Sequence, residues 1–165
     1  MTKKFLMFAM AMVLALPLLA GAEEAPQFGK EVGQALKPFD LKQVDGPNVT
    51  LASLAGKKTV LVFMQSSCTQ CRDEMKAINA MYDNIKDKVN VAAIGVDIEP
   101  ARLTQYKSAY KIQFPILLDP DFTVPTSIGV RVTPATIILD KDGKIARKIL
   151  GGIGQGDLEE LFSKL

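Results

Sequence analysis

Apolar residues form two kinds of pattern in the first half of the chain, and each pattern predicts a different element. Continuous apolar runs at 59–64 (TVLVFM) and 89–98 (VNVAAIGVDI) are typical of strands buried on both faces. Between these runs, one apolar residue recurs every three or four positions: Cys71, Met75, Ile78, Tyr82 and Ile85. This spacing predicts a helix with one apolar face, so the segment is expected to form a strand–helix–strand unit.

The second half of the chain continues this alternation and ends it with a hairpin. A helix is predicted from Pro100 to residue 110, followed by a short strand at 115–119. Two strand-like runs within 135–150 flank the turn dipeptide Asp142-Gly143, which predicts an antiparallel hairpin. The order of elements favours an α/β sandwich whose central mixed sheet is flanked by helices, with parallel crossovers before the hairpin.

The C-terminal segment 156–165 is predicted to be an amphipathic helix. Its apolar residues recur at helical spacing: Leu158, Leu161, Phe162 and Leu165. Asp157 and Glu160 stand at the spacing of a capping box, so Asp157 is expected to cap this helix.

Residues 1–22 have the pattern of a secretory signal peptide. Two lysines precede an apolar run of about fifteen residues, and the small residues at 20–22 (AGA) provide a cleavage site. An uncleaved membrane anchor is the alternative, but the run is shorter than about 20 residues and contains Pro17. No cysteine follows the run, so a lipid anchor on an N-terminal cysteine is not expected.

Two further segments precede the strand at 59–64. Residues 23–37 are polar with scattered glycine, and they are predicted to be a linker. The folded domain is expected at 38–165, and it would begin with a β-hairpin that turns at Asp45-Gly46.

Export changes both the charge and the redox setting of the chain. The sequence has 20 lysines and arginines against 18 acidic residues, and cleavage after residue 22 would remove Lys3 and Lys4, leaving 18 of each. A balanced charge without a basic block gives no reason to expect nucleic acid or an anionic membrane as a partner. In the periplasm, or wherever else the chain is exported, an oxidising environment allows the two cysteines to pair.

The two cysteines of the chain stand two residues apart, at Cys68 and Cys71, in a sequence without histidine. A zinc or copper site is disfavoured because no third cysteine and no histidine is available, so no metal is expected. A purely structural disulfide is a second alternative, but a four-residue ring gives the smallest loop-closure stabilisation. A redox-active pair fits the position best, because Cys68 follows a buried strand and begins a helix, where free N–H groups favour a thiolate. Cys71 belongs to the apolar helix face, so Cys68 is expected to attack and Cys71 to resolve the mixed disulfide.

With these motifs, the sequence resembles the thioredoxin superfamily, in particular the exported TlpA-like thiol–disulfide oxidoreductases with a redoxin domain. The resemblance extends from about Leu36 to Leu165. It rests on the run CTQCRDEM, on FPILLD, and on GVRVTPATIILDKDGKI followed by a glycine-rich exit into the last helix. It implies a thioredoxin-like fold with a cis peptide bond before Pro134, facing the cysteine pair.

The resemblance also implies roles for three further residues. Thr133 and Pro134 would bind the extended backbone of a substrate beside the first cysteine. Glu74 lies one helical turn after the second cysteine, and it would take the proton of that thiol. The alternative for Glu74 is an ordinary acid in the first turn of a helix, favoured there by the helix dipole.

Four positions depart from the family pattern: Val62, Ser67, Gln70 and Lys76. Ser67 stands where tryptophan is common before the first cysteine, and Gln70 where proline is common before the second. Lys76 replaces a proline that often follows the Glu-Met pair, and Val62 replaces the buried aspartate of cytosolic thioredoxins. These departures leave the reaction type intact, but they weaken any prediction of redox potential and partner.

The resemblance implies an exported enzyme that exchanges disulfides with protein substrates, acting as a reductant of the cytochrome c maturation type. It would be a monomer that receives electrons from an upstream membrane dithiol protein and needs no metal or organic cofactor. A peroxiredoxin-like peroxidase is the second interpretation, although its motif P-x-x-x-[TS]-x-x-C is absent, since Leu61 stands at its proline position and Gln65 at its threonine or serine position. The third is a non-enzymatic binding or assembly module with the same fold, whose disulfide stays closed.

Overall fold

The structure is a computed structural model that describes residues 32–165. The predicted signal peptide (1–22) and most of the predicted linker (23–37) lie outside the described residues. The elements of the described part follow one another in this order: β1 (Asp40–Leu41), β2 (Val49–Thr50), the 3-10 turn η1 (Ala52–Leu54), β3 (Lys58–Met64), α1 (Thr69–Ile85), β4 (Val89–Gly95), α2 (Pro100–Tyr110), β5 (Ile116–Leu118), α3 (Thr123–Ser127), β6 (Ala135–Leu139), β7 (Ile145–Leu150) and α4 (Gln155–Ser163).

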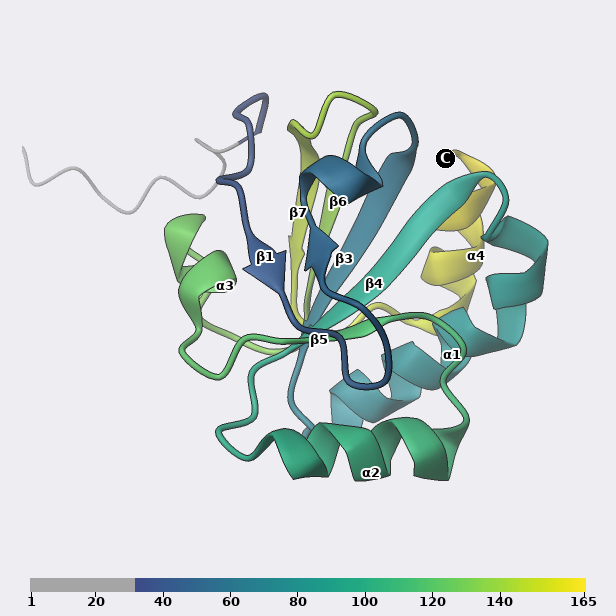
Figure 1. Ribbon diagram of the computed structural model, residues 1–165. Coiled ribbons are helices and arrows are strands. Elements are labelled where there is room, and N and C mark those ends of the chain that lie inside the picture. Colours follow the sequence, from purple (N-terminus) through teal and green to yellow (C-terminus); the bar gives the residue numbers. More distant parts are fainter. Residues whose placement is uncertain (1–31) are drawn as a thin grey trace, which may run out of the picture.

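A five-stranded mixed sheet forms the centre of the molecule, in the order β5-β4-β3-β6-β7 (Figure 1). Strands β3, β4 and β5 are parallel to one another, whereas β6 runs antiparallel to both β3 and β7. Met64 pairs with Gly95, and Phe63 pairs with Ala135. The carboxyl ends of β3 and β4 therefore meet the start of β6 at one edge of the sheet, which is where the cysteine pair follows. The predicted α/β fold with a mixed sheet is confirmed.

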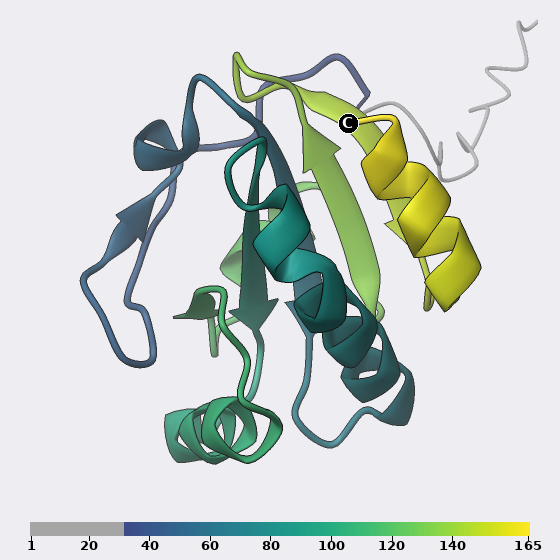
Figure 2. The same cartoon turned by 90° about the vertical axis from the view of Figure 1, so that its right-hand side faces the viewer.

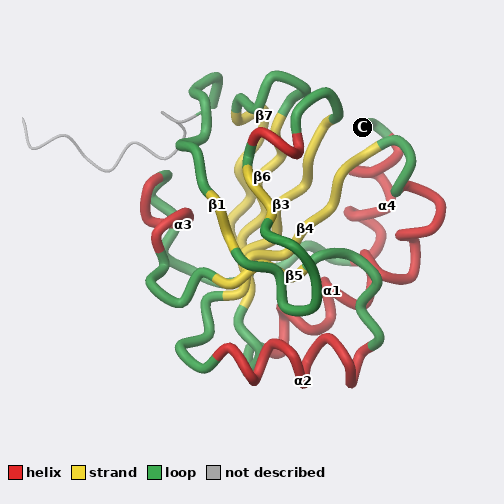
Figure 3. The backbone as a smooth tube through the Cα atoms, in the orientation of Figure 1, coloured by secondary structure: helices red, strands yellow, loops and turns green. Residues whose placement is uncertain are grey.

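Helices and loops cover both faces of this sheet (Figure 3). One face carries α1, α2 and α4, and the other carries α3 and the N-terminal hairpin (Figures 1 and 2). The side chains of β3 alternate between the two layers: Val62 and Met64 pack toward α1 and α4, whereas Leu61 and Phe63 pack toward α3. This burial on both faces explains the continuous apolar run at 59–64.

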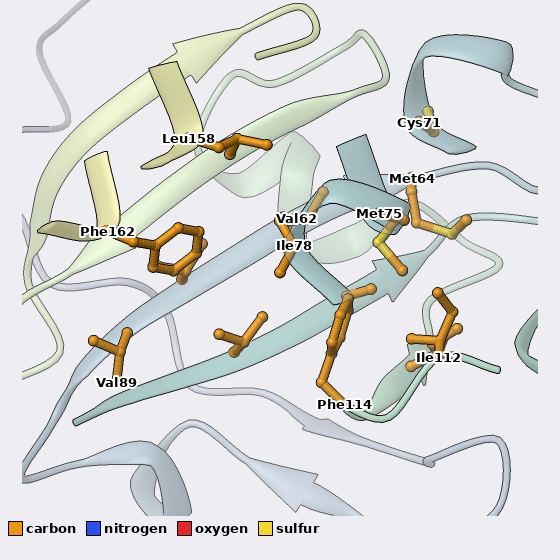
Figure 4. Packing of buried hydrophobic residues seen from close by; sticks show 14 of the residues in the cluster. Val62, Met64, Cys71, Met75, Ile78, Val89, Ile112, Phe114, Leu158 and Phe162 are labelled. Carbon is orange, nitrogen blue, oxygen red and sulfur yellow. The ribbon is translucent and has the colours of Figure 1, made fainter. Parts of the chain in front are cut away.

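The apolar face of α1 packs directly on the sheet. Met75 and Ile78 have no exposed surface, and they lie against Val62 and Phe114 in the larger core cluster (Figure 4). The helix predicted from the spacing of these residues is confirmed, and its burial fixes the orientation of its first turn over the sheet edge.

The N-terminal hairpin is present, with β1 and β2 paired antiparallel. The folded part begins before residue 38, however. The Gly33 N–H donates to the Ile145 carbonyl at 2.7 Å, Ala35 forms a bridge with Lys144, and Leu36 is only 2% exposed. Residues 33–36, which the sequence places in the linker, therefore pair beside the β6–β7 hairpin.

Helix α4 begins two residues before the predicted cap. Its N-cap is Gly154, and no side chain hydrogen-bonds at that position, so the capping box predicted from Asp157 and Glu160 is wrong. Asp157 lies inside the first turn instead, where its charge still complements the helix dipole. Within residues 32–165, no helix has the length and apolar character needed to cross a bilayer.

Candidate active site

Cys68 and Cys71 form a disulfide directly after β3, where α1 begins. Their Cα atoms lie 5.2 Å apart. Cys68 is the N-cap of α1, and its Sγ accepts a hydrogen bond from the Cys71 backbone N–H at 3.1 Å. A free N–H group and the positive end of the helix dipole thus point at this sulfur, an arrangement that favours the thiolate when the disulfide is open.

The two sulfurs differ in exposure. Cys71 has no exposed surface and belongs to the core cluster under α1 (Figure 4), whereas Cys68 is half-buried. The apolar spacing of the helix predicted this difference, since Cys71 shares a face with Met75. A substrate can therefore reach Cys68 but not its partner.

The segment before β6 lies against the exposed sulfur. The Thr133–Pro134 peptide bond is cis, as the family resemblance implied. The Thr133 carbonyl oxygen lies 3.8 Å from the Cys68 Sγ. Because a sulfur in a disulfide carries no proton, this is a contact rather than a hydrogen bond, and a Cys68 thiol would have a proton to donate there.

Glu74 is a buried carboxyl group in the first turns of α1, with 2% of its surface exposed. Its Oε1 accepts a hydrogen bond from the Thr136 hydroxyl at 2.7 Å, and its Oε2 accepts one from the Ile153 N–H at 3.1 Å. Burial raises the pKa of Glu74 above its usual range, and the two hydrogen bonds oppose this shift without reversing it. A raised carboxyl pKa beside a cysteine pair is typical of a group that exchanges a proton during catalysis.

The glycine-rich segment 151–154 (GGIG) completes the site, although its sequence predicts only an exit into the last helix. A Cβ on Gly152 would lie 3.5 Å from the Gln70 Cβ and 3.7 Å from the Pro134 Cγ, so this residue packs between the cysteine loop and the cis proline. A pocket of about 300 Å³ lies between this segment and α1, and Glu74 lines it. The clustered glycines were the available sign that the backbone approaches the site closely here.

The structure thus brings all five predicted site residues to one edge of the sheet: Cys68, Cys71, Glu74, Thr133 and Pro134. Thr136 and the Ile153 N–H are additional partners of the carboxyl group. Neither was predicted, because each belongs to a segment far from α1 in the sequence.

The chain is similar to known proteins over most of its length. Residues 32–148 match the AhpC/TSA family. The chain is 28% identical over 136 residues to the thiol-disulfide oxidoreductase ResA of Bacillus thuringiensis subsp. konkukian, covering 82% of this chain and 79% of that protein. It is also 28% identical over 137 residues to the thioredoxin-like protein YneN of Bacillus subtilis, covering 81% and 80%.

Solved structures share the fold. A secreted Mycobacterium tuberculosis disulfide oxidoreductase superposes with a TM-score of 0.69 at 22% identity, covering 77% of this chain and 96% of that one. The exposed lipoprotein thioredoxin Etrx1 of Streptococcus pneumoniae also gives 0.69, at 24% identity, covering 78% and 100%. These likenesses confirm the thioredoxin-like fold, and the cysteine pair together with the named relatives supports a thiol–disulfide oxidoreductase. Because the family match spans most of the sequence, the chain belongs to the AhpC/TSA family.

Proposed function

We propose that this protein is an exported thiol–disulfide oxidoreductase that reduces disulfides in protein substrates. The observation that carries the proposal is the Cys68–Cys71 disulfide at the N-terminus of α1, with one sulfur accessible and the other buried. The relatives named thiol-disulfide oxidoreductase ResA support it. A secreted relative and an exposed lipoprotein among the similar structures favour export after cleavage of residues 1–22.

In the first step, the Cys68 thiolate attacks one sulfur of a substrate disulfide. The substrate S–S bond breaks, a Cys68–substrate disulfide forms, and one substrate thiolate leaves. The Cys71 N–H stabilises the attacking thiolate through its hydrogen bond to the Cys68 sulfur. The backbone at Thr133-Pro134, whose carbonyl oxygen lies beside that sulfur, binds the extended substrate chain.

In the second step, Cys71 attacks the Cys68 sulfur of the mixed disulfide. The Cys68–substrate bond breaks, the intramolecular disulfide forms, and the second substrate sulfur leaves, so that two electrons have passed to the substrate. Glu74 takes the proton of the Cys71 thiol, a role that suits a carboxyl group whose pKa burial has raised. Its neighbouring pocket provides room for water to carry that proton away.

Regeneration of the dithiol requires an upstream electron donor, and a membrane dithiol protein fits an exported monomer of this kind. Thiols perform every bond change in this scheme, so the reaction needs no metal or organic cofactor. The direction of electron flow depends on the midpoint potential. A value above about −150 mV, measured against glutathione, would overturn the assignment as a reductant.

Reduction of insulin by dithiothreitol tests the reaction. The protein is expected to accelerate insulin reduction, and Cys68→Ser is expected to return the rate to that of dithiothreitol alone because the attacking sulfur is gone. Cys71→Ser should instead accumulate a mixed disulfide with insulin, visible as a shift in mass. An unaccelerated reaction would overturn the proposal, and a disulfide that no dithiol opens in the folded protein would favour a binding or assembly module.

Membership of the AhpC/TSA family keeps a peroxidase as the second candidate. Gln65 stands three residues before Cys68, where the peroxidatic motif has threonine or serine, so peroxide consumption is expected to be at background level. Peroxide consumption that disappears in Cys68→Ser, without insulin reduction, would replace the reductase by a peroxidase.

A further inference from the structure

Cys68 is the last residue of a tight turn, and the side chain of Asp97 accepts hydrogen bonds from this turn. The Cys68 N–H donates to the Gln65 carbonyl at 3.1 Å, which closes the turn 65–68. Asp97 follows β4 and is 4% exposed. Its Oδ2 accepts a hydrogen bond from the Ser66 N–H at 2.8 Å, and its Oδ1 accepts one from the Ser66 hydroxyl. Both oxygens of Asp97 therefore bind one residue within the turn that presents Cys68.

The parallel pairing of β3 and β4 creates this contact. The Val96 N–H donates to the Met64 carbonyl at 3.0 Å, so the chain leaving β4 runs beside the chain leaving β3. The next residues along each chain are Asp97 and the turn that contains Ser66. None of the steps proposed above for disulfide exchange uses this buried carboxylate.

A negative charge on Asp97 affects the ionisation of the Cys68 thiol. Ser66 and Cys68 are two residues apart, so their Cα atoms are separated by no more than about 7.6 Å. A buried charge is screened less than an exposed one. The charge of Asp97 therefore opposes a second negative charge on the Cys68 sulfur and counteracts the helix N-terminus.

We propose that Asp97 positions Cys68 by holding the turn 65–68, and that its negative charge disfavours the Cys68 thiolate and so makes the cysteine pair a stronger reductant. The inference rests on the proposed function, and it names a residue that lowers the midpoint potential and so favours electron flow to the substrate. A less favourable thiolate destabilises the dithiol relative to the disulfide, and a dithiol destabilised in this way gives up its electrons more readily.

Other charged groups surround the pair, and they are unchanged in the first test. They come from the first two turns of α1, from the start of α2 and from the segment before Pro134: Arg72, Asp73, Glu74, Glu99, Arg102 and Arg131. Glu99 pairs with Arg102 at 3.1 Å, and the hydrogen bond and charge of Glu99 raise the pKa of Arg102, with a smaller contribution from the charge of Asp97. Arg102 and Asp97 line the same pocket beside the turn 65–68, so Arg102 is the cation placed to offset part of the charge of Asp97.

The test compares charge variants of the reduced full-length protein in alkylation by iodoacetamide. Asp97→Asn keeps an amide oxygen for Ser66 and removes the charge, so Cys68 is expected to react about three- to tenfold faster at pH 7. The gain should shrink as pH rises and the thiolate becomes fully formed in both proteins. The matched control is Glu99→Gln, which removes a charge that is 67% exposed and should change the rate less than twofold.

Three further experiments test the charge and the positioning role separately. Against glutathione at pH 9, Asp97→Asn should shift the exchange equilibrium toward the dithiol by up to about tenfold, equivalent to about 30 mV. Arg102→Gln leaves Asp97 intact but removes the offsetting cation, so it should slow alkylation about two- to threefold. Asp97→Ala removes both oxygens that accept hydrogen bonds from Ser66, so its rate of insulin reduction should fall at least fivefold. Asp97→Asn should retain most of this rate.

An unchanged alkylation rate in Asp97→Asn, an equal gain in Glu99→Gln, or an unchanged rate in Arg102→Gln would overturn the role of the charge. Equal insulin reduction by Asp97→Ala and the unmodified protein would overturn the positioning role. Alkylation and midpoint potential require no protein substrate, so a negative insulin result for the unmodified protein would count against the proposed function alone.

Discussion

Glu74 is a carboxyl group with almost no exposed surface, and its neighbours act on it in opposite directions. Loss of solvation raises its pKa, whereas hydrogen bonds from the Thr136 hydroxyl and the Ile153 N–H lower it, and burial has the larger effect. The family resemblance predicts Glu74 as a site residue, because it stands one helical turn after Cys71. Its two partners come from β6 and from the segment before α4, and no local pattern connects those segments to α1.

The raised pKa of Glu74 predicts how stability depends on pH. In the unfolded chain this carboxyl group loses its proton near its ordinary value of 4.5, whereas the folded protein keeps the proton to higher pH. The folded state therefore binds more protons in this window, and the contribution of Glu74 to the free energy of unfolding should fall as pH rises from about 4.5 through the raised pKa. Urea unfolding between pH 4 and pH 8 measures this fall.

Glu74→Gln cannot ionise, so its stability curve should lack that fall, and curves of equal slope in both proteins would contradict the prediction.

Thr136→Val changes the residue whose hydroxyl donates a hydrogen bond to Glu74. It removes the hydroxyl that stabilises the charged carboxylate, so it should raise the pKa of Glu74 further and cost about 1–3 kcal/mol of stability at pH 8.

Among the elements, helix α1 and the segment 151–154 together determine the geometry of the site. The helix was predictable, because the spacing of its apolar residues requires only local sequence, and its burial then places Cys71 inside and Cys68 at the surface. The start of α4 was not predictable in the same way. The capping pattern at Asp157 is a local preference, and the close approach of Gly152 to Pro134 and Gln70 sets the path of the chain instead.

Substitution of Gly152 tests this contact between elements. Gly152→Ala adds one carbon at ordinary contact distance from Gln70 and Pro134, so insulin reduction should stay within twofold of the unmodified protein. The additional methyl groups of Gly152→Val require space that these two residues occupy. We expect the segment to move away, the Ile153 N–H to leave Glu74, and insulin reduction to fall at least fivefold, with a loss of about 1–3 kcal/mol in stability.

A melting curve for each variant distinguishes this outcome from unfolding. Full activity in Gly152→Val would show that the segment does not need its close approach to the cysteine loop.

For the molecule as a whole, stability resides in the two core clusters rather than in the disulfide. The sheet is covered on both faces, and its central strand β3 is buried from Thr59 to Met64. The Cys68–Cys71 ring contains four residues, so its loop-closure contribution is about 2 kcal/mol. A protein that opens and closes this bond in every cycle needs a fold that does not depend on it.

Reduction with dithiothreitol should therefore leave the protein folded. We expect the free energy of unfolding to fall by no more than about 2 kcal/mol, because the core contacts are unchanged. Thermal unfolding followed by circular dichroism, with and without dithiothreitol, measures the difference, and the Cys68→Ser/Cys71→Ser double variant provides the control without a disulfide. Cooperative unfolding on reduction would contradict the prediction and would point to a structural role for the bridge.

Local patterns in the sequence were sufficient to identify the five strands of the central sheet, helices α1, α2 and α4, the cysteine pair at a helix start, and the difference in burial between Cys68 and Cys71. These features follow from residue spacing, which repeats with the period of the element that the residues form. Only the tertiary structure decided which groups meet around the pair: Thr136 and the Ile153 N–H on Glu74, and Asp97 on Ser66. Each of these contacts joins segments that strand order and register bring together, and neither strand order nor register is encoded in the spacing of neighbouring residues.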